Sequence, residues 1–447
     1  RYLFANMGEL QCTTKICEFT SHLKPAVIAQ QLLIHKPDII GFGVYIWNVD
    51  ISTRVIHLIK TIDPEVVIVI GGPEVSYEYE QQKIFQLSNH LIRGAADLSF
   101  VQLCQSILKH QSPLPKIIDE PPAALHDIKF PYAYYNSEDI QNRIIYVEAS
   151  RGCPFKCEFC LSALDRTSVP FNLDNFLNEI DRLYQRGARN FKFVDRTFNL
   201  KIESSSRILK FFLQRLDKNL FVHFEIIPDR LPETLKTLIK RFPRGTLQFE
   251  VGIQSFNPQV QTLISRKQDT DKTIENLNWL RRQSKAHIHA DLIFGLPGDD
   301  LASFADSFNL LYKLRPHDIQ LGILKRLRGT PLIRHSRGFA LKFDAYAPYS
   351  ILSTDRIDFL TIQRISRFAR YWDLIANSNC FKQSLDLLLG KEPFERFLLF
   401  SDWLYLQCNT TYQLSRRKLY DYLFDGLTRY FMLNQDEAAA SLLADYH

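Results

Sequence analysis

The chain contains no uncharged apolar run of about 18 residues, which is the length that a membrane-spanning helix requires. Its first residues, 1–6 (RYLFAN), lack the charged-then-apolar layout of a signal peptide. Basic residues exceed acidic ones only slightly, 55 against 49 in 447 residues, whereas nucleic-acid binding needs clustered positive charge. We therefore expect a cytoplasmic protein with no membrane span and no nucleic-acid partner.

Cysteine is also scarce, with eight residues in the whole chain, which does not suggest a disulfide framework. Three of the eight nevertheless lie within eight residues, and such clustering in a cytosolic protein more often indicates metal binding. Hydrophobic residues make up 46% of the sequence and charged residues 23%, so disorder is not the default interpretation. The length predicts two or three globular domains.

Short apolar runs alternate with helical patterns over residues 1–112, which indicates a Rossmann-like, doubly wound parallel sheet. Ligands bind such sheets beyond the carboxyl ends of the strands, where Gly43, Gly71 and Gly72 fall. The chain begins at what would be the first helix of such a domain, so we expect its first strand to be missing. The predicted strands are 15–19, 39–45, 66–70 and 90–93, and the predicted helices are 25–36, 50–61, 76–86 and 97–109.

A second α/β series occupies residues 142–335, after a proline- and aromatic-rich segment, 113–141, that we predict to be a linker. Its six βα repeats predict a partial TIM barrel, a (βα)6 unit with its site at the strand carboxyl ends. Over residues 340–447, Leu, Phe and Tyr recur at helical spacing, which predicts a helical C-terminal domain. The six predicted barrel strands are 144–149, 191–194, 222–227, 247–251, 288–293 and 319–324.

The three clustered cysteines, Cys153, Cys157 and Cys160, follow the first of these strands in a glycine-containing loop. Their Cys-x3-Cys-x2-Cys spacing lets one loop direct three thiolates at three corners of an iron–sulfur cubane, which usually takes four cysteines. The fourth iron is then open to a small molecule. A structural zinc site would need four ligands, normally in two pairs, and the sequence holds no second pair.

With the aromatic Phe159 before the last cysteine, this motif resembles the signature of the radical S-adenosylmethionine (SAM) superfamily. The resemblance covers about 142–330. It implies a [4Fe–4S] cluster on the three cysteines whose open iron chelates the amino and carboxylate groups of SAM. The reduced cluster would cleave SAM to methionine and a 5′-deoxyadenosyl radical that takes hydrogen from a small-molecule substrate. An external reductant such as flavodoxin or ferredoxin is implied, and no catalytic residue is assigned.

The same resemblance implies polar and glycine contacts to SAM where later barrel strands end. An acidic or amide side chain there would bond the polar parts of the cofactor, and a Gly-Leu-Pro-Gly turn resembles the family's turn near the adenine. Each of these residues could instead cap a strand, pair with a cation or form an ordinary turn. The matching residues are Asp195, Glu225, Gln254, Ser255, Gly295 and Gly298.

Residues 1–112 resemble the cobalamin-binding domain that precedes the radical domain in one subclass, through 37–43 (PDIIGFG) and 67–74 (VIVIGGPE). The resemblance implies that Gly43, Gly71 and Gly72 approach cobalamin. The Asp-x-His-x-x-Gly motif, which supplies a cobalt-ligating histidine in many relatives, does not occur in this sequence. Residues 340–447 resemble a helical domain of unknown function found after such radical domains.

Three functions remain open from the sequence. The first is cobalamin-dependent methyl transfer to an unactivated carbon. The second is oxidative cyclisation, because the anaerobic magnesium-protoporphyrin monomethyl ester cyclases share this two-domain layout. The third is a non-catalytic iron–sulfur scaffold or electron carrier.

Overall fold

The computed structural model describes residues 1–446. None of the helices in this part of the chain is long and apolar enough to cross a bilayer. The described residues form two compact units that interleave along the sequence. The first unit contains residues 1–191, 326–331 and 344–349, and the second contains residues 192–325, 332–343 and 350 onward.

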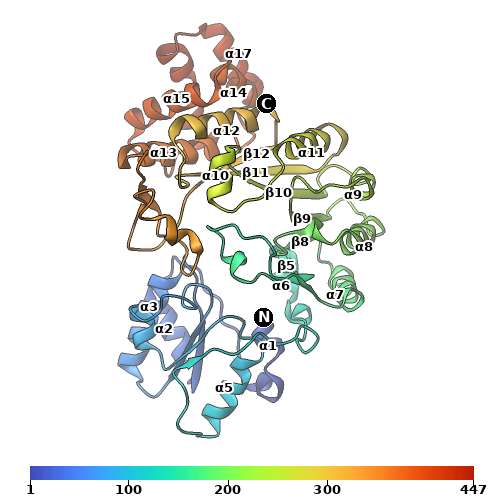
Figure 1. Ribbon diagram of the computed structural model, residues 1–447, viewed down its shortest axis with the longest axis vertical. Coiled ribbons are helices and arrows are strands. Elements are labelled where there is room, and N and C mark those ends of the chain that lie inside the picture. The colour runs from blue at the N-terminus through green and yellow to red at the C-terminus, as the bar shows by residue number, and fades with distance from the viewer. Residues whose placement is uncertain (447) are drawn as a thin grey trace. The chain divides into compact units, whose positions relative to one another are not determined.

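A four-stranded sheet in the order β1-β2-β3-β4 forms the amino-terminal part of the first unit. Its neighbouring strands are parallel, with Ile40 beside Ile68 and Ile70 beside Leu91. Figure 1 shows this sheet with the helices α2, α3 and α5 around it. The bounds are β1 Ile39–Gly43, β2 Val67–Gly71, β3 His90–Ile92, β4 Ile117–Ile118, α2 Pro25–Leu33, α3 Val49–Ile62, α4 Lys83–Leu87 and α5 Ser99–Leu108.

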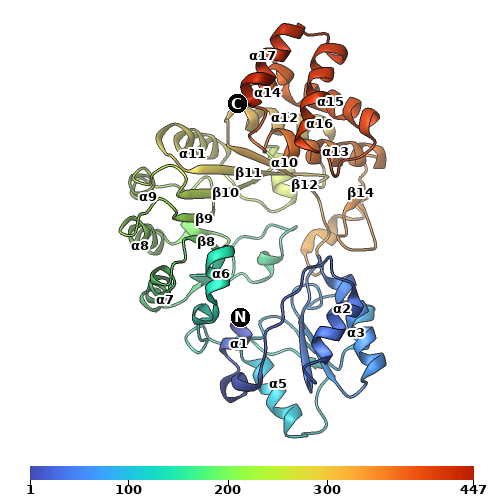
Figure 2. The same cartoon turned by 180° about the vertical axis from the view of Figure 1, so that it is seen from behind.

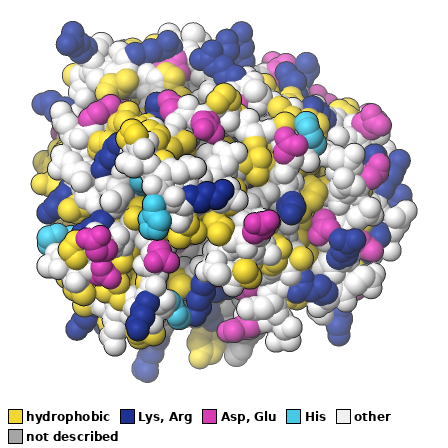
Figure 3. All heavy atoms as spheres, turned by 90° about the horizontal axis from the view of Figure 1, so that it is seen from below, with side chains coloured by type: hydrophobic (Ala, Val, Ile, Leu, Met, Phe, Trp, Pro, Cys, Tyr) yellow, Lys and Arg dark blue, Asp and Glu magenta, His cyan; other side chains and the backbone are white. Residues whose placement is uncertain are grey.

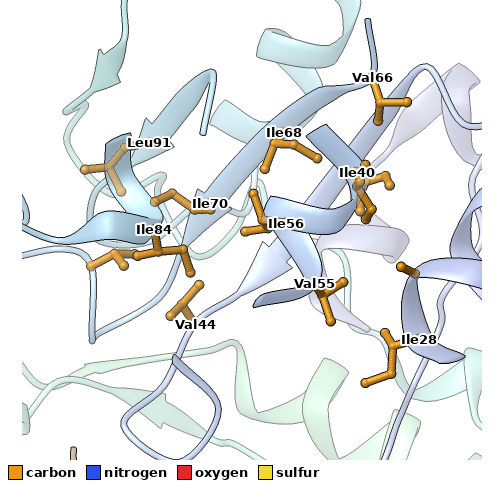
Figure 4. Close-up of a cluster of buried hydrophobic side chains, with 13 residues drawn as sticks. Ile28, Ile40, Val44, Val55, Ile56, Val66, Ile68, Ile70, Ile84 and Leu91 are labelled. Atoms are coloured by element: carbon orange, nitrogen blue, oxygen red, sulfur yellow. The ribbon is translucent and has the colours of Figure 1, made fainter. Parts of the chain in front are cut away.

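Alternate residues of each strand point to opposite faces of this sheet, and both faces are buried. On one face, Ile68 and Ile70 pack in one core with Ile56 of α3 (Figure 4). On the other face, Val69 packs with Leu103 of α5. Burial on both sides explains why these strands read as unbroken apolar runs in the sequence. The predicted Rossmann-like sheet is confirmed.

The strand predicted at residues 15–19 is wrong. This segment has no regular secondary structure, and the described sheet ends at β1 and β4 without it. Its Phe19 instead packs against the core beneath α2 and α3. Phe19 is half-buried by this contact, but a strand also needs a neighbour that pairs its backbone.

The helix predicted at 76–86 is shortened to α4. Glu78 has a left-handed backbone conformation, with φ of 50°, which an α-helix cannot contain. The Gln82 side-chain amide donates to the carbonyl oxygens of Glu74 and Glu78, so this polar turn replaces the first helical turns. The segment predicted as a linker contributes β4 and the helix α6, Ser137–Asn142, which a capping box of Asn136 and Asp139 begins.

Six strands make the second sheet, in the order β5-β8-β9-β10-β11-β12, and those from β9 to β12 pair in parallel. Figure 1 shows α8, α9 and α11 side by side along this sheet. This arrangement confirms the predicted partial barrel. The bounds are β5 Ile145–Val147, β8 Asn190–Phe193, β9 Phe221–Ile226, β10 Leu247–Gln254, β11 His287–Phe294, β12 Asp318–Ile323, α7 Leu173–Gln185, α8 Ile202–Leu213, α9 Glu233–Ile239, α10 Pro258–Leu263, α11 Thr270–Gln283 and α12 Leu301–Lys313.

The carboxyl-terminal part of the second unit is helical, as predicted (Figure 2). Its aromatic residues form a core in which Phe368 contacts Trp372, Phe394 and Phe397. All four are buried, so their spacing serves packing. The bounds are α13 Phe359–Ile375, α14 Lys382–Leu389, α15 Pro393–Cys408, α16 Arg416–Asp425 and α17 Gln435–Tyr446.

The short remaining elements include two small antiparallel pairs, one at the base of the cysteine loop and one after the barrel. On the face shown in Figure 3, Lys and Arg side chains are interspersed with Asp and Glu. The remaining bounds are α1 Tyr2–Ala5, η1 Gly8–Thr13, η2 Tyr132–Tyr134, β6 Ser150–Arg151, η3 Leu161–Leu164, β7 Val169–Pro170, η4 Phe198–Leu200, η5 Pro331–His335, β13 Lys342–Phe343, β14 Ile351–Ser353 and η6 Gly426–Tyr430.

Gly72, which follows β2, supplies a stability prediction. Its φ is 108°, and a Cβ atom there would lie 2.5 Å from the carbonyl oxygen of Val44. We expect Gly72→Ala to lower the free energy of unfolding by more than the roughly 1–2 kcal/mol that a left-handed backbone alone costs. Gly245→Ala is the matched control, because Gly245 has a φ of 87° and open space around it. Equal losses in urea unfolding of the two variants would contradict the prediction.

Candidate functional site

The cysteine loop begins and ends in a short antiparallel pair of strands, β6 and β7. At its start Gly152 has a φ of 86°, and a Cβ atom there would lie 2.5 Å from the Thr167 carbonyl oxygen. The next residue, Cys153, donates its backbone N–H to the Asp165 carbonyl oxygen at 2.9 Å. The Asp165 carboxylate in turn accepts from Thr167. Only glycine can occupy position 152, because the two ends of the loop approach so closely there. The hydrogen bond from Cys153 to Asp165 holds these ends together.

Within the loop, Cys160 donates its N–H to the Cys157 carbonyl oxygen, and η3 follows directly. Cys153 is buried, whereas Cys157, Phe159 and Cys160 are partly buried. No group of three or more His, Cys, Asp or Glu side chains within residues 1–446 stands ready to hold a metal ion. The fold places the three thiols on one loop whose two ends are held together. Three thiols suit a cluster, and ligand geometry often forms only on binding.

Arg151, the residue before Gly152, forms a charged cluster with two carboxylates at the base of the cysteine loop. Its guanidinium donates to both carboxylate oxygens of Asp97 at 2.7 and 3.2 Å, and to Glu148 at 2.9 and 3.0 Å. It also lies over the rings of Tyr2 and Phe171. The sequence analysis did not single out this arginine, since one of its acidic partners, Asp97, lies 54 residues earlier.

Two predicted SAM contacts, Asp195 and Glu225, lie at the ends of β8 and β9. Asp195 is buried. The Glu225 carboxylate forms an ion pair with Arg196 at 3.0 Å. Burial raises the pKa of Glu225 and neighbouring Glu250 adds to this, while Arg196 opposes it. Arg196 is therefore a partner that the sequence analysis missed, although it directly follows Asp195.

Gln254 ends β10 at a bulge, where the register with β11 shifts, and it has a left-handed φ of 71°. Its Oε1 is buried and has no hydrogen-bond partner among the described residues. Strain of this kind in a non-glycine residue often marks a ligand site. Adjacent Ser255 is buried in the following turn, where its hydroxyl accepts from the backbone of Asn257. Gln254 thus fits a cofactor contact, and Ser255 shapes the turn.

The predicted adenine turn, Gly295 to Gly298, follows β11, and both glycines have positive φ, 90° and 77°. A Cβ atom on either would meet a neighbouring side chain, at 2.8 Å from Ile351 and 2.6 Å from Leu263. The next residue, Asp299, was missed by the sequence analysis. It is 1% exposed, and neither carboxylate oxygen has a hydrogen-bond partner within residues 1–446. Burial raises its pKa to about 6.

A polar layer lines one face of the barrel strands, and the sequence analysis missed it. His289 of β11 lies between the carboxylates of Asp291 and Asp318 at 3.3 and 3.5 Å. Burial opposes its charging, but these hydrogen bonds raise the pKa of His289 to about 10. On β9 and β10, the His223 hydrogen bond lowers the pKa of Glu250 to about 2. The alternating His-x-His-x-Asp of β11 was the available signal, since such residues share one face.

The three glycines predicted to approach cobalamin lie at the carboxyl ends of β1 and β2. Gly43 is exposed, and a Cβ atom there would meet only the Tyr45 ring, at 3.6 Å, so this edge is open to a ligand. Gly71 and Gly72 are closely packed by backbone instead. The Gly-Gly-Pro-Glu turn is fixed by Glu74.

Glu74 is 4% exposed and accepts hydrogen bonds from two residues distant in the sequence. Arg328 donates to it at 2.8 Å and the Tyr349 hydroxyl at 2.5 Å. Burial and this carboxylate raise the pKa of Tyr349 to about 12. All three residues belong to the first unit. The hydrogen bonds therefore attach the glycine turn to residues 326–331 and 344–349, the two later segments of that unit.

Comparison with known proteins assigns the three regions to families. Residues 2–103 match the B12 binding domain, residues 147–311 the radical SAM superfamily, and residues 337–447 a protein family of unknown function, DUF4080. The chain is 23% identical over 331 residues to an uncharacterized methyltransferase of Pyrococcus horikoshii, covering 68% of this chain and 70% of that protein.

Two further proteins resemble the chain. It is 23% identical over 331 residues to TokK, a cobalamin-dependent radical SAM methyltransferase of Streptomyces tokunonensis, covering 65% of this chain and 48% of TokK. The structure of OxsB, a cobalamin-dependent S-adenosylmethionine radical enzyme with aqua-cobalamin and S-adenosylmethionine bound, matches with a TM-score of 0.62 at 13% identity. That match covers 100% of this chain and 80% of the OxsB chain and shows a shared fold.

Asp299 yields a prediction about pH. Because burial raises the pKa of Asp299 from its ordinary value of 3.8 to about 6, the folded state binds the proton more tightly, and stability is lost as pH rises from 4 through 6. We expect Asp299→Asn to remove this loss and to raise the free energy of unfolding at pH 7.5 by up to about 3 kcal/mol relative to wild type. At pH 4 the difference should nearly vanish.

Urea unfolding at both pH values measures the effect of this substitution. The control is Asp271→Asn, on the exposed first turn of α11. This substitution should change the free energy of unfolding by a similar amount at the two pH values. A gain for Asp299→Asn that is equal at pH 4 and pH 7.5 would show that the carboxyl group does not titrate between them.

Proposed function

We propose that this chain, a cobalamin-binding member of the radical SAM superfamily, transfers a methyl group to an unactivated carbon of a small-molecule substrate. One observation supports this most: a B12 binding domain at 2–103 and a radical SAM domain at 147–311 occur in one chain. The same pairing is implied by the description of TokK as a cobalamin-dependent radical SAM methyltransferase.

Cys153, Cys157 and Cys160 would hold a [4Fe–4S] cluster, with Phe159 beside them. The closed base of their loop, at Gly152 and Asp165, would keep the thiolates near one another. When bound, the reduced cluster supplies the electron that cleaves S-adenosylmethionine, and cobalamin carries the methyl group. The electron would come from flavodoxin or ferredoxin, which fits a cytoplasmic setting where thiols stay reduced.

Residues at the barrel strand ends would bind and orient SAM. The Gln254 Oε1 atom, buried without a partner among the described residues, would accept a hydrogen bond from it. Asp195 and Glu225 would bond its polar groups, and Gly295 and Gly298 would let the backbone approach the adenine. Ser255 would hold the turn behind Gln254. For cobalamin, Gly43 offers the open edge, and Gly71 and Gly72 form the adjoining turn.

The reaction class can be decided on reconstituted protein under anaerobic conditions. With SAM, cobalamin and a reductant, we expect 5′-deoxyadenosine together with methylcobalamin and S-adenosylhomocysteine. Deoxyadenosine without either methyl-transfer product would favour the cyclase type of reaction. A cluster whose electron paramagnetic resonance (EPR) spectrum does not change on adding SAM would indicate a scaffold or electron carrier and would refute the proposal.

The cysteine assignment predicts the iron content of variants. Replacing Cys153, Cys157 and Cys160 together by alanine should abolish iron binding on reconstitution, because a cluster needs these thiolates. Cys380→Ala is the control, since Cys380 lies in the second unit, outside the cysteine loop, and this variant should retain full iron. Iron analysis and absorption spectra measure both variants. Retention of a cluster by the triple variant would overturn the assignment.

The Gln254 assignment predicts a change in cofactor affinity. Gln254→Ala should weaken SAM binding about five- to tenfold, which corresponds to one hydrogen bond. Gln248→Ala is the control, because Gln248 lies on the same strand, near the opposite end of β10. Equilibrium dialysis against SAM measures both. Equal affinities for the two variants would show that Gln254 makes no contact with the cofactor.

A further inference from the structure

The guanidinium of Arg151 links the cysteine loop to the B12-binding domain. Its Nη1 and Nη2 atoms donate to the two oxygens of Asp97, at 2.7 and 3.2 Å. Asp97 belongs to residues 2–103 and lies just before α5, whereas Arg151 belongs to residues 147–311. Both lie in the first compact unit. This bidentate pair therefore joins two family domains at one point.

Other contacts around Arg151 hold its guanidinium in the position that pairs with Asp97. Glu148 accepts from its Nε and Nη2 atoms. The rings of Tyr2 and Phe171 lie 4.8 and 5.5 Å from its guanidinium carbon. The side chains of Asp97 and Glu148 are 8% and 13% exposed, so neither acid can exchange its partner for water without local opening.

The connection from Arg151 to the first cysteine is short and rigid. Gly152 crosses the backbone of Thr167 so closely that no Cβ atom fits. Cys153 then donates its N–H to Asp165. The backbone between Arg151 and Cys153 is therefore held by contacts on both sides, while the Arg151 guanidinium is held by Asp97 and Glu148.

We propose that Arg151 is a positioning residue that fixes the cluster-bearing loop relative to the cobalamin-binding domain. This inference rests on the proposed function, in which the radical made at one cofactor must act within reach of the other. A lysine could keep the charge but not the planar fork that engages Asp97 and Glu148 together. The charge alone is therefore not sufficient.

Hydrogen exchange on the cofactor-free protein tests the connection directly. We expect the Cys153 amide to exchange about tenfold faster in Arg151→Lys and in Asp97→Asn, with no further increase in the double variant. Asp97→Asn removes one charge at constant size, so it still tests the effect of the pair on exchange at Cys153 if the arginine variant folds poorly. Arg143→Lys is the matched control, because Arg143 pairs with Glu18 and Asp139 in the same unit.

The reconstituted holoprotein gives the second measurement. Pulsed dipolar EPR spectroscopy between the reduced cluster and cob(II)alamin should give a narrow distance distribution in wild type and Arg143→Lys. Arg151→Lys and Asp97→Asn should broaden or shift it. A role in packing alone would change unfolding midpoints without moving this distribution.

Two results would overturn the proposal. One is wild-type exchange at Cys153 together with an unchanged distance distribution in both test variants. The other is an equal effect of Arg143→Lys, which would mean general loosening of the unit. A wild-type protein that holds no cobalamin would instead refute the proposed function, and the exchange data would still decide the role of Arg151.

Discussion

Burial of both faces of parallel strands is the constraint on which the rest of this structure depends. In the sheet of β1 to β4, Ile68 and Val69 bury opposite faces, so apolar side chains dominate those strands. The groups proposed to meet a ligand lie where the strands end, at Gly43 and Gly72. The barrel relaxes this constraint on one face only, and there His289 and its carboxylates are paired with one another.

Local patterns were sufficient to predict most of the strands. Residues 39–45 and 66–70 are unbroken apolar runs with glycine within or directly after them, and both contain strands. Residues 15–19 are a short mixture of apolar and charged residues and form no strand, because strand formation also depends on a neighbour that the local sequence does not contain. The cysteine loop was predictable for a different reason, since spacing within eight residues is itself the signal.

The charged partners at the candidate site could not be predicted. Arg151 and Asp97 are 54 residues apart, and Glu74 and Arg328 are 254 apart, so only the folded chain brings them together. Asp299 is different, because it directly follows a turn that the sequence does identify. Its burial without a partner depends on packing around α12, which no local pattern reports.

The partners of Glu74 have a consequence for the order in which the chain is made. A ribosome completes the glycine turn long before it reaches Arg328 and Tyr349, which follow Glu74 by 254 and 275 residues. At about 5–20 residues per second, that interval is roughly 13–55 s. During it the Glu74 carboxylate has neither native partner, so the nascent amino-terminal domain must keep it hydrated. The domain that holds Glu74 therefore closes only after the barrel has been translated.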